Sequence, residues 1–244
     1  MAAVASQIVL NPVVSQSLKL WSTTVGRDKT YRAVQYFARF FAWWLLRRGY
    51  TVQGARWNNL KSSLGSGRKL MRLFKPLEHL QAALRATQAS TSPGEQITTI
   101  ARQLSYFGYL TYDMLVWAHS IRFVTFTPET ARKVNKISQR FWLAGILFSI
   151  TNGLLKTGRL ANEAKALRDP TEKSFGDDGV KRARLSAVAT QRATTRHQLV
   201  IDLLDVWLPA TGLGLVNLND GVAGIFGLIT SLLALQSQWS AVSK

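Results

Sequence analysis

One stretch near the C-terminus limits what this chain can fold into: residues 221–243 contain no charged side chain. A helix over this stretch would be about 35 Å long at roughly 1.5 Å per residue, and a bilayer core is about 30 Å thick. The length therefore predicts a membrane-spanning helix, with Trp239 near the far interface. A buried helix of a soluble domain is the alternative, because Gln236 and Gln238 make the far end more polar.

Two further apolar segments precede this stretch. Residues 141–155 are uncharged between Arg140 and Lys156, and they fit either a short span or a core helix. Residues 103–121 carry Asp113 near their middle, and a carboxylate costs several kcal/mol at the centre of a bilayer. We therefore interpret residues 103–121 as a core or interface helix.

The whole chain has the pattern of consecutive helices. Alternation with period two is not sustained anywhere, and an apolar face of helical spacing begins at Tyr31, with Asp28 as the expected N-cap. The predicted fold class is all-α: a helical membrane protein with amphipathic N-terminal helices and a C-terminal apolar helix. We predict four regions: amphipathic helices in 1–89, central apolar helices in 95–155, a charged flexible loop in 156–197, and membrane-associated helices in 198–244.

Composition indicates an anionic partner and gives no sign of catalysis. The 31 Lys and Arg against 13 Asp and Glu give a net charge of +18, which suits nucleic acid or an acidic lipid surface. The long apolar C-terminus and the lack of any nucleic-acid-binding motif favour lipid, so no nucleic acid is expected. The chain has no Cys, its three His lie far apart, and the common catalytic and phosphate-loop motifs are absent. We expect no catalytic residue, no metal site and no cofactor.

Residues 57–75 form a basic segment without any acidic residue. On a helical wheel its apolar and cationic side chains separate, which is typical of a helix lying among lipid headgroups. The side chains predicted to enter the membrane are Trp57, Leu60, Leu64, Leu70, Met71, Leu73 and Phe74. The side chains predicted to bind anionic phospholipid are Lys61, Arg68, Lys69, Arg72 and Lys75. Insertion would expand one leaflet and bend the membrane; a surface helix of a soluble bundle is the alternative.

An N-terminal motif resembles the signature of the peroxin-eleven family, close to its filamentous-fungal form. The motif consists of Gly26, Arg27, Asp28 and Lys29, followed by Gln35, Tyr36, Arg39 and Phe40. The resemblance covers most of the chain. It implies residence in the peroxisomal membrane, self-association into homo-oligomers, membrane elongation before fission, and links to a dynamin-type GTPase and its membrane adaptor.

These observations support one leading hypothesis and two alternatives. The leading hypothesis is a non-enzymatic protein that curves the peroxisomal membrane through its basic amphipathic segment and so promotes proliferation and fission. The first alternative is a metabolite pore lined by amphipathic helices and Asp113. The second is a scaffold that recruits or stimulates the dynamin-type fission machinery through residues 156–197 or the N-terminal helices.

Overall fold

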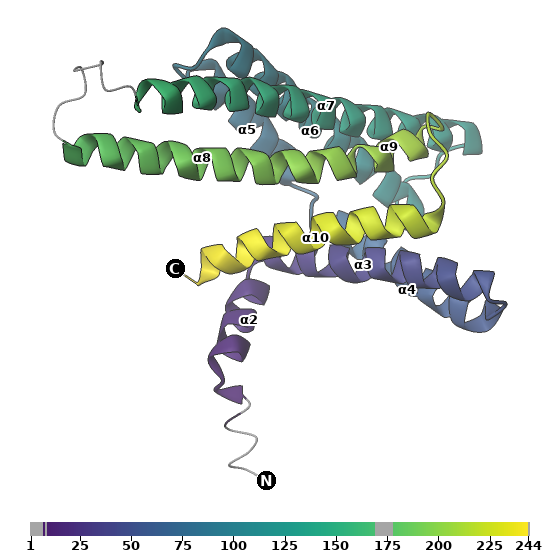
Figure 1. The fold of residues 1–244 in the computed structure, drawn as a ribbon. Helices are drawn as coiled ribbons and strands as arrows, with labels where there is room; N and C mark the ends of the chain where they lie inside the picture. Colours follow the sequence, from purple (N-terminus) through teal and green to yellow (C-terminus); the bar gives the residue numbers. More distant parts are fainter. Residues whose placement is uncertain (1–6, 8, 169–177, 244) are drawn as a thin grey trace.

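A computed structural model describes residues 7, 9–168 and 178–243, and these residues form helices and turns without any strand. The predicted all-α class is confirmed (Figure 1). The main helices are α2 (Pro12–Ser22), α3 (Thr24–Arg47), α4 (Thr51–Leu70), α5 (Lys75–Thr87), α6 (Pro93–Ser120), α7 (Pro128–Ala166), α8 (Asp178–Asp205), α9 (Trp207–Gly212) and α10 (Asp220–Val242).

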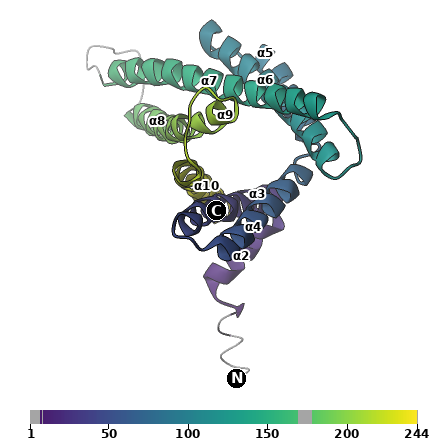
Figure 2. The same ribbon diagram turned by 90° about the vertical axis from the view of Figure 1, so that its right-hand side faces the viewer.

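The helices are arranged in two groups, with α10 between α3 and α8. Helices α2, α3, α4 and α10 form one group, and helices α5 to α9 form the other (Figure 2). Helix α10 packs along α3 and also contacts α8, while α4 contacts α6, so the groups meet along two seams. Among the described helices, only α10 is long and apolar enough to cross a membrane.

Short polar side chains set the starts of several helices. Thr23 accepts a hydrogen bond from the Gly26 amide at 3.0 Å, and Asn219 accepts one from the Val222 amide at 3.0 Å. The prediction that Asp28 caps the first long helix is wrong, because α3 begins at Thr24 and Asp28 lies one turn inside it. Asp28 is therefore available for a contact with another helix.

The basic segment 57–75 is not one helix, contrary to the sequence prediction. Helix α4 ends at Leu70, residues 71–74 form turns, and α5 begins at Lys75 with Pro76 in its first turn. Pro76 has no amide hydrogen, and its ring would clash with the carbonyl of residue 72 in a continuous helix. The break lets the segment change direction between the two helix groups.

The charged stretch 156–197 is helical over residues 156–166 and 178–197, so the predicted flexible loop is wrong for those residues. Helix α7 continues to Ala166 and α8 begins at Asp178; residues 169–177 lie outside the described part of the chain. Leu160, Ala164 and Leu167 recur at helical spacing and bury against Val188 of α8. Many charged residues surround these apolar positions in the sequence. The helical periodicity of the apolar residues was therefore not recognised from the sequence.

Candidate functional site

The family-signature motif lies on α3 and packs it against α10. A Cβ added to Gly227 would lie 2.2 Å from the Tyr36 ring, and one added to Gly224 would lie 2.7 Å from the backbone nitrogen of Phe40. These glycines therefore permit an approach that larger residues would block. Beside them, Arg39 donates to the carboxylate of Asp220, at 2.6 Å from Nη2.

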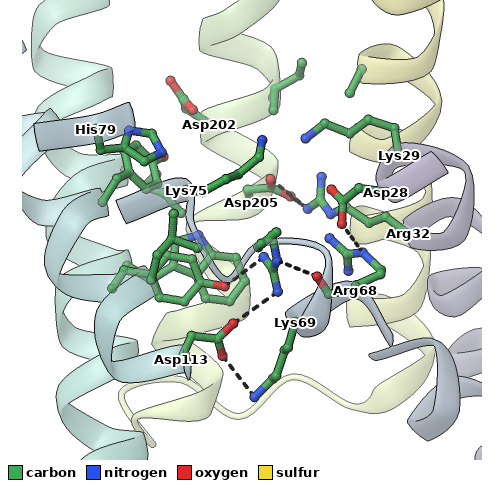
Figure 3. A pocket seen from close by; sticks show the side chains of 18 of the residues that line it. Asp28, Lys29, Arg32, Arg68, Lys69, Lys75, His79, Asp113, Asp202 and Asp205 are labelled. Atoms are coloured by element: carbon green, nitrogen blue, oxygen red, sulfur yellow. Dashed lines mark hydrogen bonds and ion pairs between the residues drawn. The ribbon is translucent and has the colours of Figure 1, made fainter. Parts of the chain in front are cut away.

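The signature also fixes the junction between α2 and α3. Gly26 lies so close to the carbonyl of Leu20 that a Cβ would meet it at 2.0 Å, which requires glycine at the α2–α3 junction. Arg27 donates from Nε to the carbonyl of Trp21. Lys29 is half-buried and extends into the interior instead of toward solvent (Figure 3).

Asp28 and Gln35 of the signature hold Arg68 of the basic segment. Arg68 donates from Nε to Asp28 at 3.0 Å and from Nη1 to Gln35 at 2.7 Å. Burial opposes ionisation of Asp28, but the nearby charges of Arg68, Arg72 and Lys29 outweigh it and hold the pKa of this carboxyl below its usual value. The Asp28 carboxyl is therefore ionised at neutral pH.

A polar cavity of about 600 Å³ lies between the two helix groups. Its charged lining consists of seven Lys or Arg side chains and four Asp side chains. The charged residues are Lys29, Arg32, Arg68, Lys69, Arg72, Lys75 and Arg102, with Asp28, Asp113, Asp202 and Asp205. Positive charge therefore exceeds negative charge inside the protein.

Most of these acids are already engaged (Figure 3). Arg32 donates to both carboxylate oxygens of Asp205, at 2.7 and 2.8 Å, and Thr230 donates to the same carboxylate at 2.7 Å. Lys69 and Arg72 share Asp113, at 2.9 and 3.1 Å. Asp113 is buried in this network, as the sequence predicted when it placed residues 103–121 in the core or at an interface.

The predicted membrane-inserting residues do not share one surface. Trp57 packs edge-on against Phe37 and Phe41, with ring centroids 5.8 and 5.0 Å apart. Leu64, Met71 and Leu73 are half-buried. Leu60, Leu70 and Phe74 are exposed, at 38%, 51% and 81% of their surface.

The predicted lipid-binding cations point mostly inward, which corrects the expected geometry. Arg68 is buried, and Lys69, Arg72 and Lys75 are half-buried in the cavity wall. Lys61, near the middle of α4, lies 3.7 Å from Asp220 of α10. Carboxylates on α3, α6 and α10 attract these cations from the helix surface, and sequence periodicity within 57–75 could not reveal such distant partners. Their role in binding lipid stays a prediction.

Four charged residues of the cavity were not predicted from the sequence: Arg32, Arg102, Asp202 and Asp205. Arg32 is buried against Asp205. A usable signal was present, because Asp202 and Asp205 stand three residues apart among apolar neighbours at the end of α8. Within the described residues, no group of three His, Cys, Asp or Glu could hold a metal ion.

The distribution of side chains defines a class of protein. Among the described residues, exposed large apolar side chains outnumber buried apolar ones, and charged residues occupy the interior. A water-soluble bundle normally shows the reverse. Together with the apolar α10, this distribution defines a helical membrane protein.

Comparison with known proteins gives the family. Residues 14–239 match the family model of peroxisomal biogenesis factor 11, so the chain belongs to this family of peroxisomal membrane proteins. It is 26% identical to peroxisomal membrane protein PMP27 of Saccharomyces cerevisiae over 98% of this chain and 99% of that protein. It is also 26% identical to PMP30A of Candida boidinii, over 98% of each chain, and 25% identical to peroxisomal membrane protein 11A of Mus musculus, over 89% and 93%. No solved structure matches it.

Proposed function

We propose that this protein curves and elongates the peroxisomal membrane by placing the turn between α4 and α5 in one leaflet. The observation that carries the proposal is the outward position of Leu70, Phe74 and Leu77, here called the insertion edge. Leu70 ends α4, Phe74 precedes α5, and Leu77 lies in its first turn.

The exposure of the insertion edge matches the depth of a shallow insertion. Phe74 and Leu77 are 81% and 64% exposed, so both can enter the acyl region without unfolding the bundle. Burying a side chain of this size in an apolar phase contributes roughly 1.5–3 kcal/mol. Three such side chains in one leaflet would anchor the turn and expand that leaflet.

Attraction to an anionic leaflet is the second part of the proposal. The net charge of +18 attracts the protein to an anionic leaflet at long range, and this attraction does not require the internal ion pairs to break. Direct binding of headgroups by Lys61, Arg68, Lys69 and Arg72 would require phosphate to replace Asp220, Asp28 and Asp113 as their partners.

Reconstitution of the full chain into liposomes tests the proposal. We expect the wild type to tubulate anionic liposomes, and we expect Phe74→Glu with Leu77→Glu to abolish tubulation while the protein stays folded. Gln53→Glu with Asn59→Glu is the matched control, because both positions are exposed on α4 and it adds the same charge. Equal tubulation by the insertion-edge variant and the control would overturn the proposal.

Self-association and a dynamin-type GTPase complete the proposed function. Crowding of several copies would multiply the effect of one insertion edge, and crosslinking in peroxisomal membranes would reveal such oligomers. Stimulation of GTP turnover by a dynamin-type protein, measured with and without this chain, would test the scaffold role.

A metabolite conduit is a second candidate, favoured by the polar cavity between the helix groups. Asp113 lies in its wall, as the pore hypothesis requires. Planar-bilayer recordings with purified protein would show conductance steps if the cavity opens to both sides. Silence at high protein density would exclude the conduit.

A further inference from the structure

Three cations in the cavity wall have no ion-pair partner. Lys29 of α3, Lys75 of α5 and Arg102 of α6 all line the cavity, and none of them forms an ion pair with any described residue. In addition, the Nε atom of Arg102 is buried without a hydrogen-bond partner, although the guanidinium stacks over the Tyr106 ring at 5.6 Å. Cations that are partly withdrawn from water and lack an ion-pair partner are favoured by a nearby counter-charge.

The ammonium groups of Lys29 and Lys75 face a common space. Figure 3 shows both side chains directed toward each other across the cavity, from opposite helix groups. Burial, together with the charges of Arg32, Arg68 and Lys75, lowers the pKa of Lys29 to about 8 against the opposing effect of Asp28. Two like charges that converge in this way leave a site of strongly positive potential between them.

The carboxylates of the cavity offset this positive charge only in part, because none of them forms an ion pair with Lys29, Lys75 or Arg102. Asp205 is held by Arg32 and Thr230, and Asp113 by Lys69 and Arg72. Asp202 accepts hydrogen bonds from Ser149 and Gln198, at 2.6 and 2.9 Å, and Figure 3 shows its carboxylate directed away from the two ammonium groups. Asp28 is paired with Arg68.

We propose that the cavity binds a phosphate-bearing anion between Lys29, Lys75 and Arg102. Two ammonium groups and a guanidinium are the donors that phosphate oxygens prefer, and the volume suits a small ligand. The three donors come from both helix groups, so the bound anion would also join those groups. The inference does not depend on curvature by the insertion edge, and it holds for a closed or an open cavity.

Two sources can supply this chemistry: a free phosphate compound or the headgroup of a phospholipid. For the free source, the full chain in uncharged detergent is titrated with inorganic pyrophosphate in a calorimeter at constant ionic strength. For the lipid source, the same chain is placed in phosphatidylcholine nanodiscs with and without phosphatidylinositol phosphate. The measurement is how far the chain protects the phosphate headgroup of that lipid. Binding in either arm supports the site and identifies the source.

Paired variants assign the binding to these residues. We expect Lys29→Gln with Lys75→Gln to weaken binding about tenfold or more, because two of the three donors lose their charge. Lys136→Gln with Lys165→Gln removes two exposed lysines of α7 and should change binding less than about twofold. Arg102→Gln provides a second test of the site should the double variant fail to fold.

The proposal fails in two ways. A folded wild type that binds neither pyrophosphate nor the lipid headgroup overturns it. So does equal binding by the wild type and a folded variant at Lys29, Lys75 or Arg102. Tubulation by the same preparations reports on the insertion edge separately, so failure of one proposal is distinguishable from failure of the other.

Discussion

Arg68 of α4 donates to Asp28 of α3 at 3.0 Å, and both side chains are buried. The contact joins the basic segment to the family signature across 40 positions of sequence. The signature is thus a set of packing and ion-pair positions that organise the N-terminal helix group. Any binding of lipid by Arg68 competes with this internal partner.

Removing Asp28 should destabilise the protein strongly. Asp28→Ala leaves Arg68 buried and without its carboxylate partner, which costs about 3–5 kcal/mol for a pair of this kind. Chemical unfolding in detergent, followed by circular dichroism, measures the loss. Glu129→Ala breaks an exposed pair with Lys133 and should cost less than about 1 kcal/mol. Similar losses for both variants would show that the Asp28–Arg68 pair is not desolvated.

Gly227 should tolerate no side chain. Gly227→Ala places a methyl group against the Tyr36 ring, so α10 must move away from α3, at a cost of about 1–3 kcal/mol. Gly158→Ala in α7 is the control, because a Cβ there meets nothing within 4 Å. That change should stabilise the helix by about 0.5–1 kcal/mol. Opposite shifts of the thermal midpoint are expected, and shifts of the same sign would contradict the close approach.

The local hydrophobic pattern of the sequence predicted which segments are helical, but it did not predict which residues of other helices they contact. The apolar periodicity after Tyr31 and the uncharged stretch 221–243 correspond to α3 and α10, because each signal lies within one helix. The placement of Arg68 depends on Asp28 and Gln35, which the sequence separates from it by 40 and 33 positions. Periodicity within a segment carries no information about such partners. The cavity combines side chains from helices of both groups, so it could not be predicted.

Lys29 should make stability depend on pH in the alkaline range. Its pKa falls from 10.5 to about 8 in the folded protein, so between these values the unfolded chain binds more protons. Stability should therefore rise from pH 8 toward pH 10 in the absence of bound anion. Above that range the raised pKa values of Tyr106, to about 12, and of Tyr109 act in the opposite direction. Unfolding at a series of pH values measures the slope, and Lys29→Met should flatten it; an unchanged slope would show that Lys29 is solvated.

Leu64→Glu and Phe74→Glu should separate folding from membrane insertion. Leu64 is half-buried on α4, so a carboxylate there should lower the thermal midpoint in detergent as well as the membrane activity. Phe74 is 81% exposed, so the same change there should leave the midpoint within about 2 °C and still reduce peroxisome elongation in cells. Thermal unfolding and organelle length are measured for both variants at matched expression. If peroxisome elongation falls only where the thermal midpoint falls, then stability, and not the insertion edge, controls the activity.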